Sequence, residues 1–364
     1  MIVRIIQPFE RFKQFKRTSH VSSVCGDTGY ILMTRIIWAV LSICGGLISV
    51  TAPVCAAQLD NVTVGYSSFS GHYVPLWTAV DDRLGRKYGL ELSAVYAGRI
   101  RPQQLLASGE TPFVLATGTG ALTSHILGIK DQVIVVGLVN RVPGASMARP
   151  EIKTPEDLRG KVIGTGRPGA LAETIVRYVL RSKFGLNPDR DVKLLPVGEP
   201  QLALQGLDRG IMDAASFSLP ATLAARKKGF REIVSYDKLG IVYPYNTVTM
   251  LRQTAAKNPD LVDRFVKLLI EGIALFRSNK DKSLAIMKKY MRINEDEVLQ
   301  ETYQATYNEL EQVPIPSLAV VRNALDMLAL QYPQAKQTDA NAIIDASFVK
   351  HLEDSGFIQA LYRK

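Results

Sequence analysis

Cysteine is rare in this sequence, and the positions of the cysteines limit the chemistry that the chain can support. The 364 residues include three cysteines, Cys25, Cys44 and Cys55, and all three lie before residue 58. A chain without this segment has no disulfide, no thiol nucleophile and no thiolate metal ligand. Its stability must then come from a large apolar core.

Histidine is also rare, and common catalytic motifs are missing. After residue 57 the histidines are His72, His125 and His351, and none has the paired spacing of a zinc-binding helix. The sequence has no Gly-x-Ser-x-Gly nucleophile motif and no Gly-Lys-Ser/Thr phosphate loop. We therefore expect a protein that is not an enzyme, with no catalytic residue, no metal and no cofactor.

A strong charge of one sign is missing after residue 57. The formal net charge is +10, and residues 1–57 hold six Lys/Arg and two Asp/Glu, which leaves +6 for the rest of the chain. This charge is ordinary for a chain of about 300 residues. We expect no nucleic-acid partner, and we expect a monomer.

The apolar run near the N-terminus is short for a membrane-spanning helix. Residues 34–57 begin with the basic Arg35, continue with an apolar run from 36 to 50, and end in the small residues of Cys55-Ala56-Ala57. This order is typical of a secretory signal, whereas a bilayer requires a longer apolar helix. We expect export to the periplasm and cleavage after Ala57.

Residues 1–57 are therefore interpreted as a leader and signal peptide. Met33 directly precedes the signal, and the residues before it have no globular pattern, so we expect Met33 to be the true start. The alternative is an unusually long basic region ahead of the apolar run. The residues Ala52-Pro53-Val54 fit a lipidation signal at Cys55 poorly, which favours a soluble product.

Strand-like and helix-like segments alternate from residue 61 to residue 235, a pattern typical of an α/β layer fold with mainly parallel pairing. The predicted strands are 61–68, 90–96, 113–117, 132–139, 161–165, 192–197, 212–217 and 232–235. The predicted helices are 75–88, 103–108, one from 120, 153–158, 170–182, 201–208 and 220–228. Asn258-Pro259 then opens a helical C-terminal region, with further helices at 282–291, 294–310, 317–330 and 346–356.

One internal echo predicts two similar lobes. Residues 105–120 read as helix, glycine turn, buried strand, hydroxyl-rich loop and helix, and residues 204–220 repeat this order. In open α/β sheets, ligands bind at the carboxyl ends of strands. Two such ends that face each other would form a cleft.

The combined segments resemble the type II substrate-binding proteins of bacterial ABC importers, and most closely the branch for alkanesulfonates, nitrate, taurine and thiamine-pyrimidine precursors. The segments that carry this resemblance are Pro75-Leu76-Trp77, 152–164, Gly166-Arg167-Pro168-Gly169, 195–198, 210–215 and Asn258-Pro259. The resemblance implies a type II periplasmic binding protein fold, with two α/β lobes that have central mixed sheets and a two-crossing hinge. The crossings are expected near 139–150 and 238–250, lobe 1 at 58–143 plus 247–364, and lobe 2 at 144–246.

The same resemblance implies a small-molecule ligand and an ABC transporter membrane permease as partners. The alternative is an enzyme of the thiamine-pyrimidine-synthase type, or a sensor input domain, on the same fold. Those synthases rely in the family pattern on a cysteine-rich iron-binding motif, which is missing after residue 57.

The candidate ligand-binding residues all follow a predicted strand or lie at a crossing. They are Ser67, Ser68, His72, Thr117, Gly118, Thr119, Arg167, Gly169, Ser216 and Tyr245. Hydroxyls and glycine N–H groups suit a polar ligand, and Arg167 suits a sulfonate or carboxylate. The alternatives are an ordinary turn for the serines, a solvated or lobe-closing contact for Arg167, and hinge packing for Tyr245.

Overall fold

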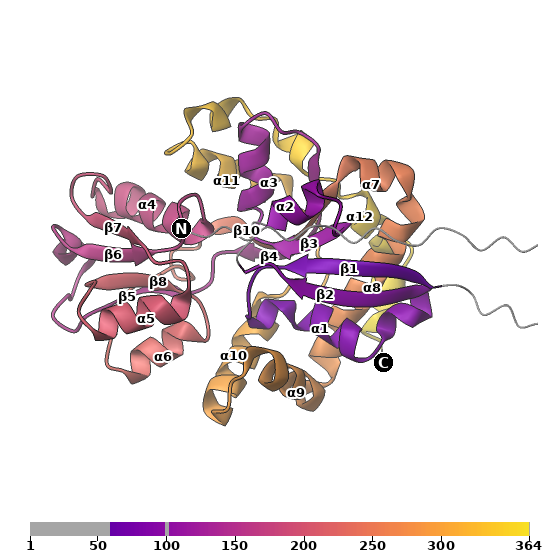
Figure 1. Cartoon of the computed structure of the whole chain (residues 1–364), viewed down its shortest axis with the longest axis horizontal. Coiled ribbons are helices and arrows are strands. Elements are labelled where there is room, and N and C mark those ends of the chain that lie inside the picture. Colours follow the sequence, from indigo (N-terminus) through magenta and orange to yellow (C-terminus); the bar gives the residue numbers. More distant parts are fainter. Residues whose placement is uncertain (1–58, 99–101, 364) are drawn as a thin grey trace, which may run out of the picture. The chain divides into compact units, whose positions relative to one another are not determined.

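The computed structural model describes residues 59–98 and 102–363. The predicted signal, its cleavage site and the start at Met33 lie outside the described residues. Two five-stranded sheets form the centre of the molecule, and helices cover both of them (Figure 1). Within the described ranges, no helix is both long and apolar enough to cross a bilayer.

Sheet A has the strand order β2-β1-β3-β10-β4. Strand β1 pairs in parallel with β2 and with β3, and β10 pairs antiparallel with β3 and with β4. The carboxyl ends of β1, β2 and β3 therefore share one edge with the start of β10. The bounds are β1 Asp60–Tyr66, β2 Leu90–Tyr96, β3 Phe113–Ala116, β4 Gln132–Arg141 and β10 Val242–Leu251.

Sheet B repeats this arrangement with the order β7-β6-β8-β5-β9. Strand β6 is parallel to β7 and to β8, and β5 in the fourth place is antiparallel to both of its neighbours. Mixed sheets are thus confirmed, whereas the expectation of mainly parallel pairing is wrong because β5 and β10 were not predicted as strands. The bounds are β5 Ala145–Ala148, β6 Val162–Thr165, β7 Lys193–Pro196, β8 Ala214–Phe217 and β9 Arg231–Ser235.

The helices before residue 230 follow the predicted pattern closely, with one break. The predicted helix 75–88 is two pieces, because Arg83 takes a left-handed conformation (φ 50°) between them. The bounds are η1 Gly71–Tyr73, α1 Val74–Asp81, η2 Leu84–Tyr88, α2 Pro102–Ala107, α3 Thr119–Ile126, η3 Pro155–Leu158, α4 Leu171–Phe184, α5 Pro200–Asp208 and α6 Ala221–Lys227. The echo is confirmed, since α2-β3-α3 and α5-β8-α6 occupy equivalent places in the two sheets.

Alternation along the strands of sheet B explains how helices cover both of its faces. Met147 and Ala215 share an apolar cluster with residues of α5 and α6. Their neighbours along the strands, Ala148 and Ala214, share another cluster with residues of α4. Because successive strand side chains point to opposite faces, the two clusters lie on opposite sides of the sheet.

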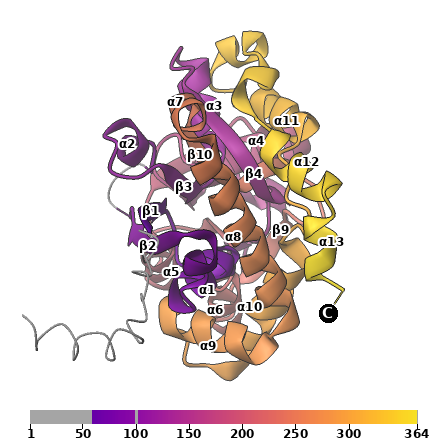
Figure 2. The same cartoon turned by 90° about the vertical axis from the view of Figure 1, so that its right-hand side faces the viewer.

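The C-terminal region is helical, as predicted, and α8 forms its centre (Figure 2). The Asn258 side chain accepts a hydrogen bond from the Leu261 N–H at 3.0 Å, and Pro259 follows at the first helical position. Phe265 of α8 stacks on Phe113 of β3, with ring centroids 4.1 Å apart, so this helix closes the core of sheet A. The bounds are α7 Arg252–Lys257, α8 Pro259–Ser278, α9 Lys280–Met291, α10 Asp296–Glu309, α11 Leu318–Leu328, η4 Pro333–Gln337, η5 Ala340–Ile343, α12 Ser347–Asp354 and α13 Phe357–Leu361.

The chain passes between the sheets twice, at residues 142–144 and 236–241. Helices that cover the two sheets also share apolar clusters. Leu223 of α6 belongs to the apolar cluster of sheet A. Leu171 and Ile175 of α4 share a cluster with Leu325 of α11. The lobe limits expected above stay a prediction.

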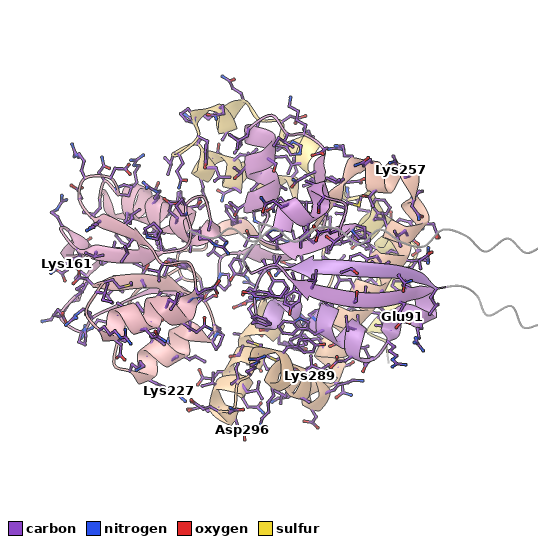
Figure 3. All side chains as sticks on the ribbon, in the orientation of Figure 1. Glu91, Lys161, Lys227, Lys257, Lys289 and Asp296 are labelled. Carbon is purple, nitrogen blue, oxygen red and sulfur yellow. The ribbon has the colours of Figure 1, made fainter. Side chains whose placement is uncertain are left out.

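An ionic contact also joins elements of the two sheets at the surface. The Lys227 ammonium lies 3.0 Å from the Glu295 carboxylate and 2.8 Å from that of Glu297. Figure 3 shows Lys227 facing the end of α10 that carries Asp296. All three paired groups are exposed, so the contact adds little to stability.

Candidate ligand site

The candidate site lies where strands of the two sheets end toward each other. The Arg167 guanidinium follows β6 of sheet B, and its Nη2 donates a hydrogen bond of 2.6 Å to the Gly98 carbonyl, which follows β2 of sheet A. Tyr245 of β10 hydrogen-bonds with Ser218, which follows β8. Loops after β2, β6 and β8 therefore meet near the start of β10.

An exposed aromatic pair lies at this edge, and the sequence had not indicated it. Phe69 and Tyr96 are 42% and 38% exposed, and their ring centroids are 4.3 Å apart. Burial raises the pKa of Tyr96, the nearby Glu199 carboxylate raises it further, and Arg167 opposes both effects. Groups from both sheets thus surround the Tyr96 hydroxyl. Aromatic faces exposed in this way suit a planar apolar ligand.

The serines after β1 differ in their surroundings. Ser67 is half-buried, and its hydroxyl lies 2.9 Å from the Tyr73 hydroxyl. Ser68 is exposed, and its side chain makes no hydrogen bond with the described residues. Ser68 is therefore the more available of the two for a ligand.

His72 is buried and already has partners on both ring nitrogens. Its Nε2 hydrogen-bonds with Glu309 of α10, and its Nδ1 lies 3.3 Å from the Ser70 hydroxyl. The ring also meets Tyr245 edge-on, at 5.3 Å between centroids. Glu309 lies 237 residues away in sequence, so no local pattern could have identified it.

The order Ser70, His72, Glu309 matches a nucleophile, a base and an orienting acid. Ser70 is 6% exposed and His72 is 5% exposed, so a substrate carbonyl has no approach to the hydroxyl. The arrangement instead fixes the turn Gly71–Tyr73 under α10, where a Cβ on Gly71 would collide with Thr306. This cluster supports packing rather than acyl transfer.

Most polar groups after β3 are used within the protein. The Thr119 hydroxyl lies 2.9 Å from the Tyr243 hydroxyl, and both side chains are buried. The Gly118 N–H donates to the Pro244 carbonyl at 2.8 Å, and a Cβ on Gly118 would come equally close to the Pro244 ring. Thr117 is the exception. It is half-buried, and its hydroxyl has no hydrogen-bond partner among the described residues.

The polar groups of Gly169 and Ser216 are also hydrogen-bonded within the protein. Gly164, Gly166 and Gly169 have the spacing of a dinucleotide fingerprint between a strand and a helix. The Gly169 N–H, however, donates to the Glu173 carboxylate at 2.7 Å, which places a negative charge where a phosphate would bind. Ser216 accepts a hydrogen bond of 2.8 Å from Tyr236.

Tyr245 and Asn246 stand at the start of β10, beside the passage between the sheets. Tyr245 is half-buried and packs against two apolar clusters, and burial raises its pKa. Asn246 is 2% exposed, and its side-chain oxygen Oδ1 has no hydrogen-bond partner in the described part of the chain. The structure thus adds Phe69 and Tyr96 to the residues expected at the site, and it shows an unpartnered oxygen on Asn246 next to the expected Tyr245.

Two hollows of the surface lie away from this edge. Their volumes are about 320 and 260 Å³, they lie beside α13 and beside β9, and neither contains a predicted site residue. Among the residues that the structure describes, no three His, Cys, Asp or Glu side chains gather in a way that would hold a metal ion.

Comparison with known proteins gives the family and the fold. Residues 85–283 match the family described as NMT1/THI5 like. A riboflavin-binding protein of Chloroflexus aurantiacus is 23% identical over 246 residues, which cover 66% of this chain and 69% of that protein. A binding protein of Brucella abortus is 24% identical over 65% of this chain and 74% of its own length.

Solved structures with this fold include binding proteins and an enzyme. The periplasmic aliphatic sulphonate binding protein SsuA from Escherichia coli matches with a TM-score of 0.67 at 19% identity, over 79% of this chain and 92% of that one. The desulfurization enzyme DSZB matches with a TM-score of 0.62 at 16% identity, over 81% and 99%. The resemblance expected from the sequence is confirmed: the chain belongs to the NMT1/THI5-like family and has the periplasmic binding protein fold.

Proposed function

We propose that this protein is the periplasmic receptor of an ABC-type importer, which captures a small organic solute between its two sheets and delivers it to a membrane permease. The observation that carries the proposal is the meeting of strand ends from both sheets around Arg167, Gly98 and Tyr245. A solute held there touches both sheets at once, so its binding favours the closed arrangement of the sheets over an open one.

The groups at this edge suit a solute with a planar part and a polar part. Phe69 and Tyr96 offer exposed ring faces, while Ser68 and Thr117 offer hydroxyls that have no hydrogen-bond partner among the described residues. The names of the relatives point to riboflavin and to aliphatic sulphonates as two solutes of different chemistry. The exposed rings of Phe69 and Tyr96 favour a planar solute such as riboflavin over an aliphatic sulphonate.

The principal alternative is an enzyme on the same fold, because DSZB shares it. One DSZB structure is a cysteine-to-serine variant in complex with biphenyl-2-sulfinic acid. Every cysteine of the present chain precedes residue 58, and the Ser70–His72–Glu309 cluster is closed to substrates. These observations support the receptor over a cysteine-dependent enzyme.

Incubation of the purified protein with riboflavin and, separately, with ethanesulfonate tests the proposal. Titration calorimetry should show one solute bound per chain for at least one compound. Mass spectrometry of the released solute should show an unchanged mass after hours of incubation. A mass change that depends on the protein would identify an enzyme, and no binding by either compound would count against both expected solute classes.

A further inference from the structure

Asn246 carries a buried hydrogen-bond acceptor that the protein leaves unused. Its side chain is 2% exposed, and Oδ1 has no partner in the described part of the chain. The register of β10 against β4 shifts on both sides of this residue. Such bulges change the direction of a side chain and often occur beside functional sites.

The place of Asn246 in the fold puts it at the candidate ligand site. Its neighbour Thr247 pairs with Ala116, the last residue of β3, so Asn246 lies level with Thr117 at the carboxyl edge of sheet A. Its amide is also close to the Tyr73 hydroxyl. Burial raises the pKa of Tyr73 to about 12, while hydrogen bonding with Ser67 and Asn246 opposes this rise.

Several donors around Asn246 are already engaged. The Tyr73 hydroxyl, which is beside the amide, lies 2.9 Å from the Ser67 hydroxyl. The Gly118 N–H donates to Pro244, and the Thr247 hydroxyl donates to the Ala116 carbonyl at 3.1 Å. The Thr119 and Tyr243 hydroxyls bond with each other. A buried acceptor without a donor is costly, and native proteins rarely keep one without a reason. Other buried polar atoms of the described residues also have no partner, but Asn246 is the one that stands at the start of β10, where a molecule that enters the site can supply the donor.

We infer that Asn246 Oδ1 accepts a hydrogen bond from the solute, and that the solute carries an N–H or O–H donor, as amides, imides and N–H heterocycles do. Sulfonate and nitrate oxygens only accept hydrogen bonds, so they leave Asn246 unsatisfied. This inference rests on the proposed function and narrows it to one class of solute. Asn246 is then a specificity-determining residue.

Matched pairs of compounds test the inference on the unaltered protein. Lumiflavin, which has the ring system of riboflavin without the hydroxylated side chain, carries one imide N–H group, and uracil carries two N–H groups. Their methylated partners, 3-methyllumiflavin and 1,3-dimethyluracil, have no N–H or O–H donor. We expect at least one N–H compound to bind, and its methylated partner to bind about 5- to 150-fold more weakly. Binding confined to ethanesulfonate, or no binding by either N–H compound, overturns the inference.

The variant Asn246→Leu separates the hydrogen bond from the bulk of the methyl group. In this variant the N–H compound and its methylated partner should bind with similar affinity, because the acceptor is gone. The variant should be less resistant to urea than the wild type, because the hydrogen bond between the amide and Tyr73 is lost, so selectivity is the readout that decides. A purely structural role for Asn246 predicts lower stability with unchanged selectivity between the two compounds.

Thr247→Val is the matched control. Thr247 is buried beside Asn246, and its hydroxyl is satisfied by the Ala116 carbonyl. This change should lower stability and leave the selectivity unchanged. If ethanesulfonate binds to the wild type and is released unchanged, while N–H compounds do not bind, the receptor function stands and the role of Asn246 fails.

Discussion

Arg167 Nη2 lies 2.6 Å from the carbonyl oxygen of Gly98, and this hydrogen bond joins the loop after β6 to the loop after β2. The two residues are 69 positions apart in sequence and belong to different sheets. The bond therefore exists only when the strand ends of the two sheets are close together. Arg167 thus makes a contact between the two sheets, and its role at the ligand stays a prediction.

Replacing Arg167 should weaken solute binding through loss of this contact. The Arg167→Ala variant should have about ten-fold lower affinity for any solute that the wild type binds. This factor corresponds to about 1.4 kcal/mol, as expected for one lost hydrogen bond of a charged group. Arg167→Lys should recover part of the loss, because an ammonium can still donate to the carbonyl. Titration calorimetry measures the three affinities.

Arg86→Ala provides the control for this series. Arg86 is exposed and pairs with Glu91 at 2.9 Å within the region of sheet A, so its loss should change the affinity by less than about two-fold. Equal affinities for the wild type and Arg167→Ala would contradict the role of the contact. A much larger loss for a negatively charged solute than for a neutral one would show that Arg167 also contacts the solute.

The aromatic pair should select planar solutes. Tyr96→Ala should weaken riboflavin binding by about 2- to 12-fold, which corresponds to the about 0.5–1.5 kcal/mol of one aromatic contact. The same change should leave the affinity for ethanesulfonate within about two-fold, because an aliphatic sulfonate has no ring to stack. Calorimetry with the two compounds decides, and a parallel loss for both would show that Tyr96 acts on the fold instead.

The buried contact between His72 and Glu309 should stabilise the protein. Glu309→Gln should lower the free energy of unfolding by about 1–3 kcal/mol, because it weakens a buried hydrogen bond that involves a carboxylate. Urea unfolding measures this change. Glu301→Gln on the same helix is the control, since Glu301 is exposed and should give a change below about 0.5 kcal/mol. Equal effects for the two variants would contradict the assignment.

His125 should make stability depend on pH. Burial holds its pKa below the usual value, the nearby Arg252 adds to this effect, and the hydrogen bond from Nε2 to the Gln132 carbonyl opposes it. Above the ordinary pKa of about 6.5, the imidazole is neutral in both the folded and the unfolded chain. As the pH falls below this value, the unfolded chain takes up the proton first, so the free energy of unfolding decreases.

His125→Gln is the variant that isolates this effect. A glutamine amide can still donate to a carbonyl but does not titrate in this range. Urea unfolding at about pH 7.5 and about pH 5.5 should show a smaller decrease for the variant than for the wild type. Identical pH dependence for the two proteins would mean that His125 does not contribute.

The sequence was a good guide to repeated local structure. The echo between residues 105–120 and 204–220 predicted α2-β3-α3 and α5-β8-α6, because glycine turns and short apolar runs mark these elements locally. Asn258-Pro259 predicted the start of α8 for the same reason. Strand β5 was missed because Ala145–Ala148 is short and rich in small residues, and β10 was missed because Pro244 interrupts its pattern.

The candidate site depends on contacts between residues that are far apart in the sequence, and no sequence motif indicates these contacts. The sequence favours Thr119 and His72 as ligand-binding side chains, because their contacts with Tyr243 and Glu309 cannot be seen in it. The same holds for Asn246, which is distinguished by a missing partner rather than by a motif. Such features arise from contacts more than a hundred residues apart, or from their absence.

Hydrogen exchange measured by mass spectrometry, with and without a bound solute, shows directly whether the solute lies between the two sheets. We expect slower exchange at strand ends of both sheets, with little change elsewhere, in residues 67–73, 117–119, 166–169, 216–218 and 243–246. Protection confined to one sheet, or centred on the hollow beside α13 or the hollow beside β9, would contradict capture of the solute between the two sheets.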